Sequence, residues 1–487
     1  MSMPYHRLRA SGVMLAGAAV AAVAAVFGFV RDLSMSSDGM PPDGMAGDRL
    51  LRGMPLGEMP EMFVALAGVL IAGLGAAMAG ARRSSPRAAL SRRARLLAVV
   101  TVTAALTIDI SKTSTLGFVI PGMRAEYGLS ARTASTLAVA GLAGTALGAL
   151  VFGVLADRLG RRNAYLVATL GFAVTGACGS MPTFAGNLVM CALMGLAVGG
   201  LAPLLITSLG DLLGGGVRGP LTIALSALAT AAGYLVASGS ALWLEPVFGW
   251  RILWLIGVPT GIALALLTPL MPDLRTADLA EQARPAFAVA RRALTRWTQY
   301  GYAVLVGLVT FGLTTWVPTL ARAGQASASA ANGMLVIAAL AMVPFAGVAA
   351  LLYLRIGPVW VSAGLALVTA ALLFVLAVSG AADTVPWLVS ASLVAALFSV
   401  NAMAAIFLPI TADLAGGEAR SRATGRVSFF NRIGGLLGPL LIAGLVSSLS
   451  DVLAAIAVLA AACAVTSVYL GYRYRVARKA AEPVPVS

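Results

Sequence analysis

The chain has 487 residues, of which 59% are hydrophobic and 11% charged, and its formal net charge is +15. Soluble proteins carry about 25% charged residues, so this composition excludes an ordinary soluble domain. In a membrane protein such a positive balance indicates basic loops on one membrane face, not nucleic-acid binding.

Apolar runs close to the length of a membrane-spanning helix recur along the whole chain. About 20 helical residues cross the roughly 30 Å apolar core of a bilayer. These runs are too long for barrel strands, so we predict an all-α membrane protein with two leading spans followed by twelve more. The expected spans are 10–30, 62–80, 96–121, 133–155, 163–182, 184–209, 220–243, 250–271, 297–321, 332–354, 358–379, 387–411, 427–447 and 451–472.

The distribution of arginine and lysine predicts the orientation. If the amino terminus is cytoplasmic and the spans alternate, 25 of these residues fall inside and 7 outside. Such a bias is typical of cytoplasmic loops, so we expect both termini in the cytoplasm of a bacterial inner membrane. The first span alternatively resembles a signal peptide, because it follows the basic stretch HRLR.

Basic stretches divide the chain into segments. The expected organisation is an extra helix pair with its loop (1–81), a cytoplasmic linker (82–95), a first six-helix half (96–271), a second linker (272–296), a second half (297–475) and a tail (476–487).

Cysteine and histidine usage excludes several classes of site. Cys178, Cys191 and Cys463 lie in or beside apolar runs, which does not suit a disulfide framework. His6 is the sole histidine, which excludes multi-histidine metal sites and a Ser-His-Asp triad. Because no nucleotide-binding loop is present either, we expect neither an enzyme nor direct use of ATP.

A charged loop joins the second and third of the twelve spans. It reads GVLADRLGRRNAY from Gly153 to Tyr165. Glycine at its start is expected to let two helices approach closely, and Asp157 to pair with nearby arginines. The residues of interest are Gly153, Leu155, Ala156, Asp157, Arg158, Gly160, Arg161 and Arg162.

This loop resembles the G-x-L-A-D-R-x-G-R-R/K motif of the major facilitator superfamily. GWRILWLIGVP (249–259) and FGLTTWVPTLARAG (311–324) are similar to segments of that family, and the resemblance covers about residues 96–475. It implies a twelve-helix fold of two six-helix halves around a central site, with alternating access. It also implies that the loop is a cytoplasmic gate whose aspartate faces 425–439.

Two charges occupy the middle of the first of the twelve spans. Charged side chains inside spans are costly and mark ion or substrate pathways. Asp109 and Lys112 lie one turn apart on one helical face. Either they neutralise each other as a structural pair, or Asp109 carries a proton while Lys112 alternates between Asp109 and an anionic substrate.

Other polar residues inside spans are candidates for the same cavity, although each could instead serve helix packing. They are Asn401, Trp316, Tyr234, Asn431 and Arg432, and for Arg432 the alternative is the cytoplasmic gate.

A methionine-rich segment, 34–62, is expected outside. Thioethers bind Cu(I), so Met35, Met40 and Met45, with Met190, Cys191 and Met194 in a later span, are a candidate copper site. Ordinary packing of flexible methionines is the alternative, in which case no cofactor is expected.

Three functions remain open from these residues. The first is a transporter of a small, anionic organic solute, coupled to protons. The second is a transporter of copper or another soft metal. The third is a sensor or assembly factor that does not transport and whose two extra helices dock a partner protein.

Overall fold

The computed structural model describes residues 3–35, 51, 53–54, 56–79, 90–176, 181–213, 218–271, 293–323, 328–379, 395–397, 399–404, 407, 420–445 and 449–481. Throughout these ranges the regular structure is helical and no strand is present. An all-α fold suits a bilayer because a helix satisfies its own backbone hydrogen bonds.

The first part of the chain forms a helix pair followed by a compact group of helices. The pair is α1 (Met3–Met35) and α2 (Pro60–Ala79), with the short η1 (Leu56–Glu58) between them. The group, called here the N-terminal half, comprises α3 (Arg92–Tyr127), α4 (Ala131–Leu159), α5 (Arg161–Gly176), α6 (Phe184–Val198), α7 (Leu201–Leu213), α8 (Arg218–Trp243), α9 (Glu245–Phe248), α10 (Ile252–Leu255), α11 (Gly257–Leu266) and η5 (Thr268–Leu270).

The second group is called here the C-terminal half. It comprises α13 (Ala293–Ala323), α14 (Ala328–Ile356), α15 (Pro358–Val378), helical residues between 395 and 407, α18 (Arg420–Ala443) and α19 (Leu449–Ala481).

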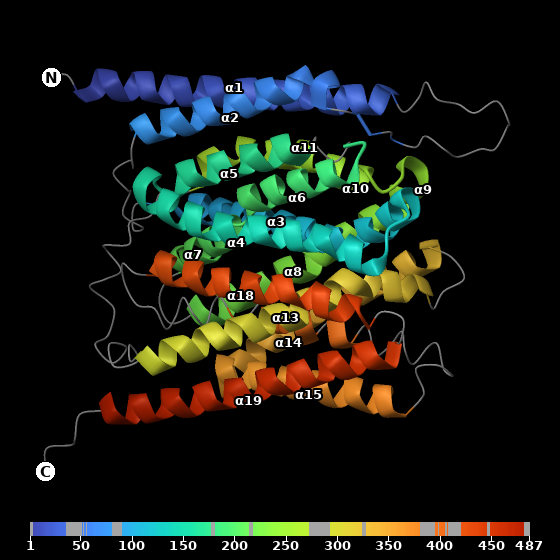
Figure 1. Ribbon diagram of the computed structural model, residues 1–487. Helices are drawn as coiled ribbons and strands as arrows, with labels where there is room; N and C mark the ends of the chain where they lie inside the picture. The colour runs from blue at the N-terminus through green and yellow to red at the C-terminus, as the bar shows by residue number, and fades with distance from the viewer. Residues whose placement is uncertain are drawn as a thin grey trace, which may run out of the picture.

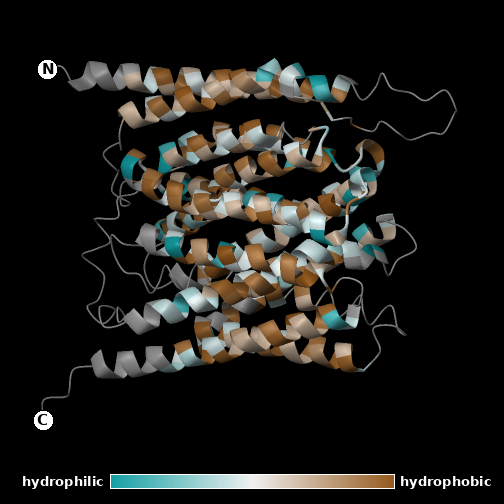
Figure 2. Ribbon diagram, in the orientation of Figure 1, coloured by the Kyte–Doolittle hydropathy of each residue, from teal (hydrophilic) through white to brown (hydrophobic). Residues whose placement is uncertain are grey.

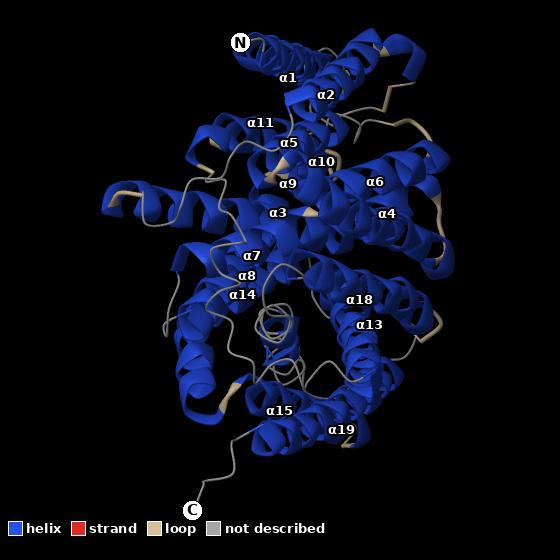
Figure 3. Cartoon of the chain, turned by 90° about the vertical axis from the view of Figure 1, so that its left-hand side faces the viewer, coloured by secondary structure: helices blue, strands red, loops and turns tan. Residues whose placement is uncertain are grey.

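The helices run side by side, with the α1–α2 pair along one flank and α15 and α19 along the other (Figure 1). Hydrophobic residues cover their middle lengths and hydrophilic ones gather toward their ends (Figure 2). The Met3 end of α1 and the Ala481 end of α19 lie on the same side, whereas α9 lies at the opposite side (Figure 1). We call these sides the terminal end and the α9 end. Figure 3 views the molecule from the terminal end.

Within the described ranges, nine helices are long and apolar enough to cross a membrane, and three shorter apolar helices accompany them. Two predicted spans match neither the nine helices nor the three shorter ones; α5 has 16 residues, and α18 carries arginines in its first half. Most of the predicted span 387–411 falls outside the described residues. The full number of spans stays a prediction.

Two predicted spans are not single helices. The span 184–209, counted above as one helix because α6 and α7 continue each other, is interrupted at Gly199 and Gly200, where a methyl group on Gly200 would lie 2.0 Å from Phe152 Cβ of α4. Predicted span 250–271 is divided into α10, α11 and η5. Hydropathy patterns average over a window, so they do not detect local breaks of this kind.

The α1–α2 pair is packed backbone to backbone and docked on the N-terminal half. Methyl groups placed on Gly17 and Gly68 would lie 2.4 Å from Ala72 N and 2.5 Å from Ala21 N. Small residues permit such approach between helices in lipid. The pair then shares an apolar cluster with Leu166 of α5 and Val258 of α11.

This packing predicts that Gly68→Ala loosens the pair. A methyl group with no room forces the helices apart, at a cost of about 1–3 kcal/mol. Gly73→Ala on the same helix is the matched control, because a methyl group there meets nothing within 4 Å. Thermal unfolding of the purified protein should separate the two variants; equal melting temperatures would contradict the close packing.

Candidate functional site

A cavity lies between the two halves and takes its lining about equally from both. Its empty volume is about 770 Å³, the space open to solvent included. Both polar and apolar side chains line it. The lining residues are Leu106, Asp109, Ile110, Thr113, Ser114, Ala202, Ile206, Ser226, Thr230, Thr310, Phe311, Thr314, Asn401, Ala404, Phe407, Ser428, Asn431 and Arg432.

Arg432 supplies the positive charge of this cavity. Its side chain is 9% exposed, and its guanidinium carbon lies 4.8 Å from the centre of the Phe311 ring. Its Nε is buried without a hydrogen-bond partner, and no carboxylate in the described part of the chain lies within 4.0 Å. A buried guanidinium without an anion is costly, so this arrangement suits a ligand that brings a negative charge.

Asp109 supplies the negative charge from the opposite half. It lies in the middle of α3, is 4% exposed and faces the same cavity. It interacts electrostatically with Arg432, although the two side chains do not form an ion pair. The cavity therefore holds a carboxyl group and a guanidinium that are separate from each other, one on each half.

Both sequence interpretations expected Lys112 to engage Asp109, either as a fixed pair or in alternation with a substrate, but the structure has no such pair. Lys112 Nζ donates a hydrogen bond to Leu253 O at 3.2 Å and lies 5.8 Å from the centre of the Phe172 ring. The carbonyl is available because α10 is only four residues long and leaves its last carbonyls without helical donors. Lys112 thus joins α3 to α10 and does not line the cavity.

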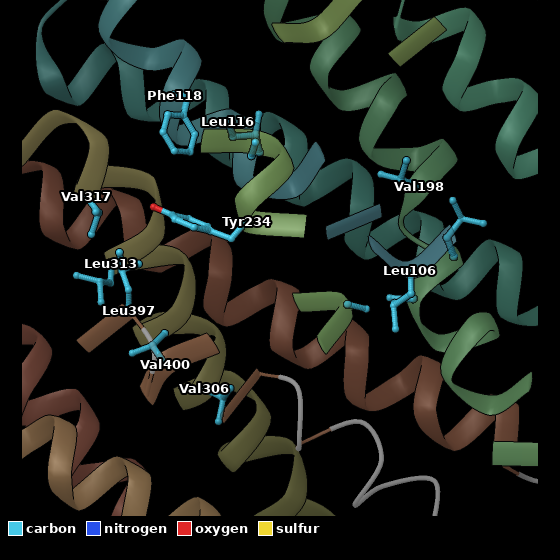
Figure 4. Packing of buried hydrophobic residues seen from close by; sticks show 14 of the residues in the cluster. Leu106, Leu116, Phe118, Val198, Tyr234, Val306, Leu313, Val317, Leu397 and Val400 are labelled. Atoms are coloured by element: carbon cyan, nitrogen blue, oxygen red, sulfur yellow. The ribbon is translucent and has the colours of Figure 1, made fainter. Parts of the chain in front are cut away.

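The remaining polar candidates divide into two groups. Asn401 and Asn431 line the cavity, as expected. Trp316 does not, because its Nε1 donates to Pro439 O at 3.0 Å and joins α13 to α18. Tyr234 packs in the apolar core, 5.9 Å from the Phe118 ring (Figure 4).

Several lining residues could not be found from the sequence. Phe311 and the hydroxyl residues Ser226, Thr310 and Ser428 come from helices α8, α13 and α18. Serine and threonine are common inside spans, where they usually bond to their own helix. The sequence therefore carried no signal that separates these residues from packing residues.

The charged loop between α4 and α5 forms a buried ion pair that the sequence did not predict. Arg161 pairs with Asp211 at the end of α7, so the loop is tied to its own half. Gly160 adopts a φ of 83°, which lets the chain turn between α4 and α5. Of its neighbours, Arg158 is exposed, and Arg162 is half-buried.

One expectation for this loop is wrong. A methyl group on Gly153 would meet nothing within 4 Å, so this glycine does not mediate a close helix contact. The helices α4 and α18 instead approach at Gly425, whose added methyl group would lie 3.4 Å from Ala149 O. The side chain of Asp157 lies outside the described residues.

At the α9 end the two halves are joined by an ion pair. Arg322 of α13 donates to both carboxylate oxygens of Glu245, at 2.7 and 3.0 Å. Asn332 of α14 adds a hydrogen bond to Glu245 at 3.3 Å. The two halves also touch where α3 meets α13, because a methyl group added to Gly117 would lie 2.6 Å from Thr314 O. The halves are therefore closed against each other at this end.

The methionines of the candidate copper site are only partly described. Met40 and Met45 and the side chain of Met35 lie outside the described residues. Met190 packs in a cluster with Met54, Met59 and Met181, apart from the main core that holds Cys191 and Met194. A copper site stays a prediction.

A bundle of membrane-crossing helices in two halves, with a polar cavity between them, is typical of secondary transporters. The family model of the Major Facilitator Superfamily matches residues 97–380 and 322–487, so the chain belongs to that family. It is therefore an integral membrane transporter and not an enzyme.

Two proteins of similar sequence are named as transporters of organic solutes. The candidate niacin/nicotinamide transporter NiaP of Bacillus subtilis is 25% identical over 69% of this chain and 84% of its own length. The gallate transporter of Pseudomonas putida is 34% identical, but the match spans 36% of this chain and 39% of that protein.

A solved structure shows the same fold. The human organic anion transporter MFSD10 (TETRAN) superposes with a TM-score of 0.60 at 16% identity, covering 78% of this chain and 99% of that one. The leading α1–α2 pair lies outside the family match.

Proposed function

We propose that this transporter carries a small aromatic carboxylate together with a proton. The observation that carries the proposal is Arg432, a buried guanidinium that faces the central cavity and has no carboxylate within 4.0 Å among the residues that the structure describes. A carboxylate accepts two parallel hydrogen bonds from such a group. Arg432 therefore binds the charged end of the substrate.

The rest of the cavity suits a flat ring. Phe311 lies under the guanidinium, and Leu106, Ile110 and Phe407 add apolar wall from both halves. Niacin and gallate, which the names of the two relatives include, are ring carboxylates, and the first name also includes the neutral nicotinamide. A ring carboxylate would place its charge on Arg432 and its apolar faces against these walls.

The charges account for coupling to protons. In the empty cavity, ionised Asp109 balances Arg432. A bound carboxylate adds a negative charge, which is costly in a site away from water. Protonation of Asp109 cancels this additional negative charge, so substrate and proton are carried together. The cavity is then electrically balanced both without substrate and with substrate bound.

The named cargoes of the relatives support an organic solute over the two alternatives, a metal cargo and a sensor that does not transport. The basic loops support an orientation with the terminal end in the cytoplasm of a bacterial inner membrane. In this orientation the structure is closed toward the outside by Glu245, Arg322 and the α3–α13 contact. The α1–α2 pair moves with the N-terminal half on which it packs.

The proposal is tested by uptake into proteoliposomes of purified protein. Benzoate, nicotinate and neutral nicotinamide are compared, with protein-free liposomes correcting for passage of the weak acids through lipid. We expect uptake of the two acids with proton movement, and little uptake of nicotinamide, which lacks the charge for Arg432. Equal uptake of nicotinamide, or uptake without protons, would contradict the proposal.

Breaking the ion pair at the α9 end should open that end more often. Glu245→Gln removes a bidentate, charge-assisted contact, and we expect a shift of about 1–3 kcal/mol, or roughly 5- to 150-fold, toward the state open there. Labelling of a Ser114→Cys reporter in the cavity by an impermeant maleimide from the α9 side measures this shift.

The charge swap Glu245→Arg with Arg322→Glu is the control, because it restores a pair of opposite charges. Labelling should return toward the level of the unmodified pair. If Glu245→Gln leaves the labelling rate unchanged, the pair does not hold the halves closed.

A further inference from the structure

Two hydroxyl groups at the cavity wall lack hydrogen-bond partners. Ser226 Oγ and Thr310 Oγ1 are both buried and have no hydrogen-bond partner in the described part of the chain, and the two residues are 1% and 7% exposed. Buried polar groups in proteins are nearly always satisfied, by protein, by water or by a ligand. These two groups therefore call for an occupant of the cavity that can hydrogen-bond.

Neighbouring hydroxyls in the same cavity behave differently. Thr113, Thr230 and Thr314 each donate to the carbonyl four residues earlier in their own helix, at 3.2, 2.8 and 2.7 Å. This local bond is the usual fate of such residues in a helix. Ser226 and Thr310 do not form it, so their hydroxyls remain available to a ligand.

Ser226 and Thr310 line the same cavity as Arg432, the proposed site for the carboxylate. Ser226 comes from α8 of the N-terminal half. Thr310 comes from α13 of the C-terminal half and directly precedes Phe311, whose ring lies under the Arg432 guanidinium. Because Thr310, Ser226 and Phe311 all line the cavity, a ring that rests on Phe311 shares that cavity with both hydroxyls.

We propose that Ser226 and Thr310 form a second polar subsite, which hydrogen-bonds a ring hydroxyl or ring nitrogen of the substrate. This inference rests on the proposed function, in which Arg432 holds the carboxylate. The subsite selects aromatic carboxylates with a polar ring atom over plain benzoate. Because its two hydroxyls come from different halves, such a substrate also links the halves across the cavity.

The test measures a preference ratio. Uptake of 4-hydroxybenzoate, 3-hydroxybenzoate and nicotinate is compared with uptake of benzoate, in the unmodified protein and in Ser226→Ala, Thr310→Val and the double variant. We expect at least one polar acid to be preferred by about tenfold in the unmodified protein, and the preference to be lost in the double variant. The Thr310→Ser variant keeps a hydroxyl at this position, so it should retain the preference for the polar acid.

Thr222→Val is the matched control. The Thr222 hydroxyl is also buried and unpaired on α8, but this residue does not line the cavity. In the Thr222→Val variant, the ratio of polar-acid uptake to benzoate uptake should equal that of the unmodified protein. Thermal stabilisation of the detergent-solubilised variants by the same acids gives the ratio for any variant that transports poorly.

The outcomes separate this inference from the proposed function. If no polar acid is preferred over benzoate, or if the double variant keeps the preference, the subsite is wrong while carboxylate transport stands. If none of the four acids is bound or transported, the proposed function fails and the subsite fails with it.

Discussion

Replacing Arg432 by glutamine is expected to abolish binding and uptake of aromatic carboxylates. The variant leaves a buried carboxylate without its cation, which costs about 2–5 kcal/mol, or roughly 30- to 5,000-fold in affinity. Arg432→Lys keeps the charge but loses the planar fork and the stacking on Phe311, so we expect an intermediate loss of about tenfold. Calorimetric binding of benzoate and nicotinate to the purified variants measures both effects.

Arg426→Gln provides the comparison. Arg426 lies on the same helix but is exposed, and it does not line the cavity. The affinity of the Arg426→Gln variant for benzoate should match that of the unmodified protein. The role of Arg432 would be refuted by a glutamine variant that binds carboxylates as tightly as this control.

Replacing Asp109 by asparagine is expected to separate transport from proton coupling. Asparagine is neutral at every pH and resembles the protonated carboxyl, so the cavity with bound substrate stays balanced without a proton. For one proton per substrate, a gradient of one pH unit drives about tenfold accumulation. The variant should therefore lose accumulation driven by the gradient, while exchange of labelled for unlabelled substrate continues.

Both quantities are measured in proteoliposomes, with protein-free liposomes subtracting the pH-driven entry of weak acids. Asp451→Asn is the control, because Asp451 is exposed at the start of α19 and does not line the cavity. Accumulation by the Asp109 variant equal to that of this control would rule out the coupling role. Loss of exchange as well would show that Asp109 is needed for the transport cycle itself.

Asp109 and Arg432 illustrate what could be predicted from the chain alone. A charge inside an apolar run is costly, so it is visible without any knowledge of packing. The same reasoning predicted that Lys112 lies at the cavity, but Lys112 does not line it. Spacing along a helix predicts which face a residue occupies, but the partner of Lys112 is Leu253, 141 residues away. Nothing local to α3 indicates that partner.

The glycines show the same limit. Gly153 was selected because it opens a recognisable motif, yet it faces open space. Gly68 and Gly200, which no motif marks, have backbone or side-chain atoms of another helix against them. Whether a glycine is required depends on what lies opposite, and this is a property of helix packing.

Composition and the loop motif were enough to predict a helical membrane transporter with two charges in the middle of one span. Lipid leaves few options for the backbone, and the charged loop at 153–165 has the residues of the family motif. Helix packing shows what the sequence could not: that Arg432 is the charge near Asp109, which described hydroxyls remain unpaired, and which ion pair joins the halves at the α9 end. These contacts join residues from different helices, so they depend on how the helices pack and not on any local pattern.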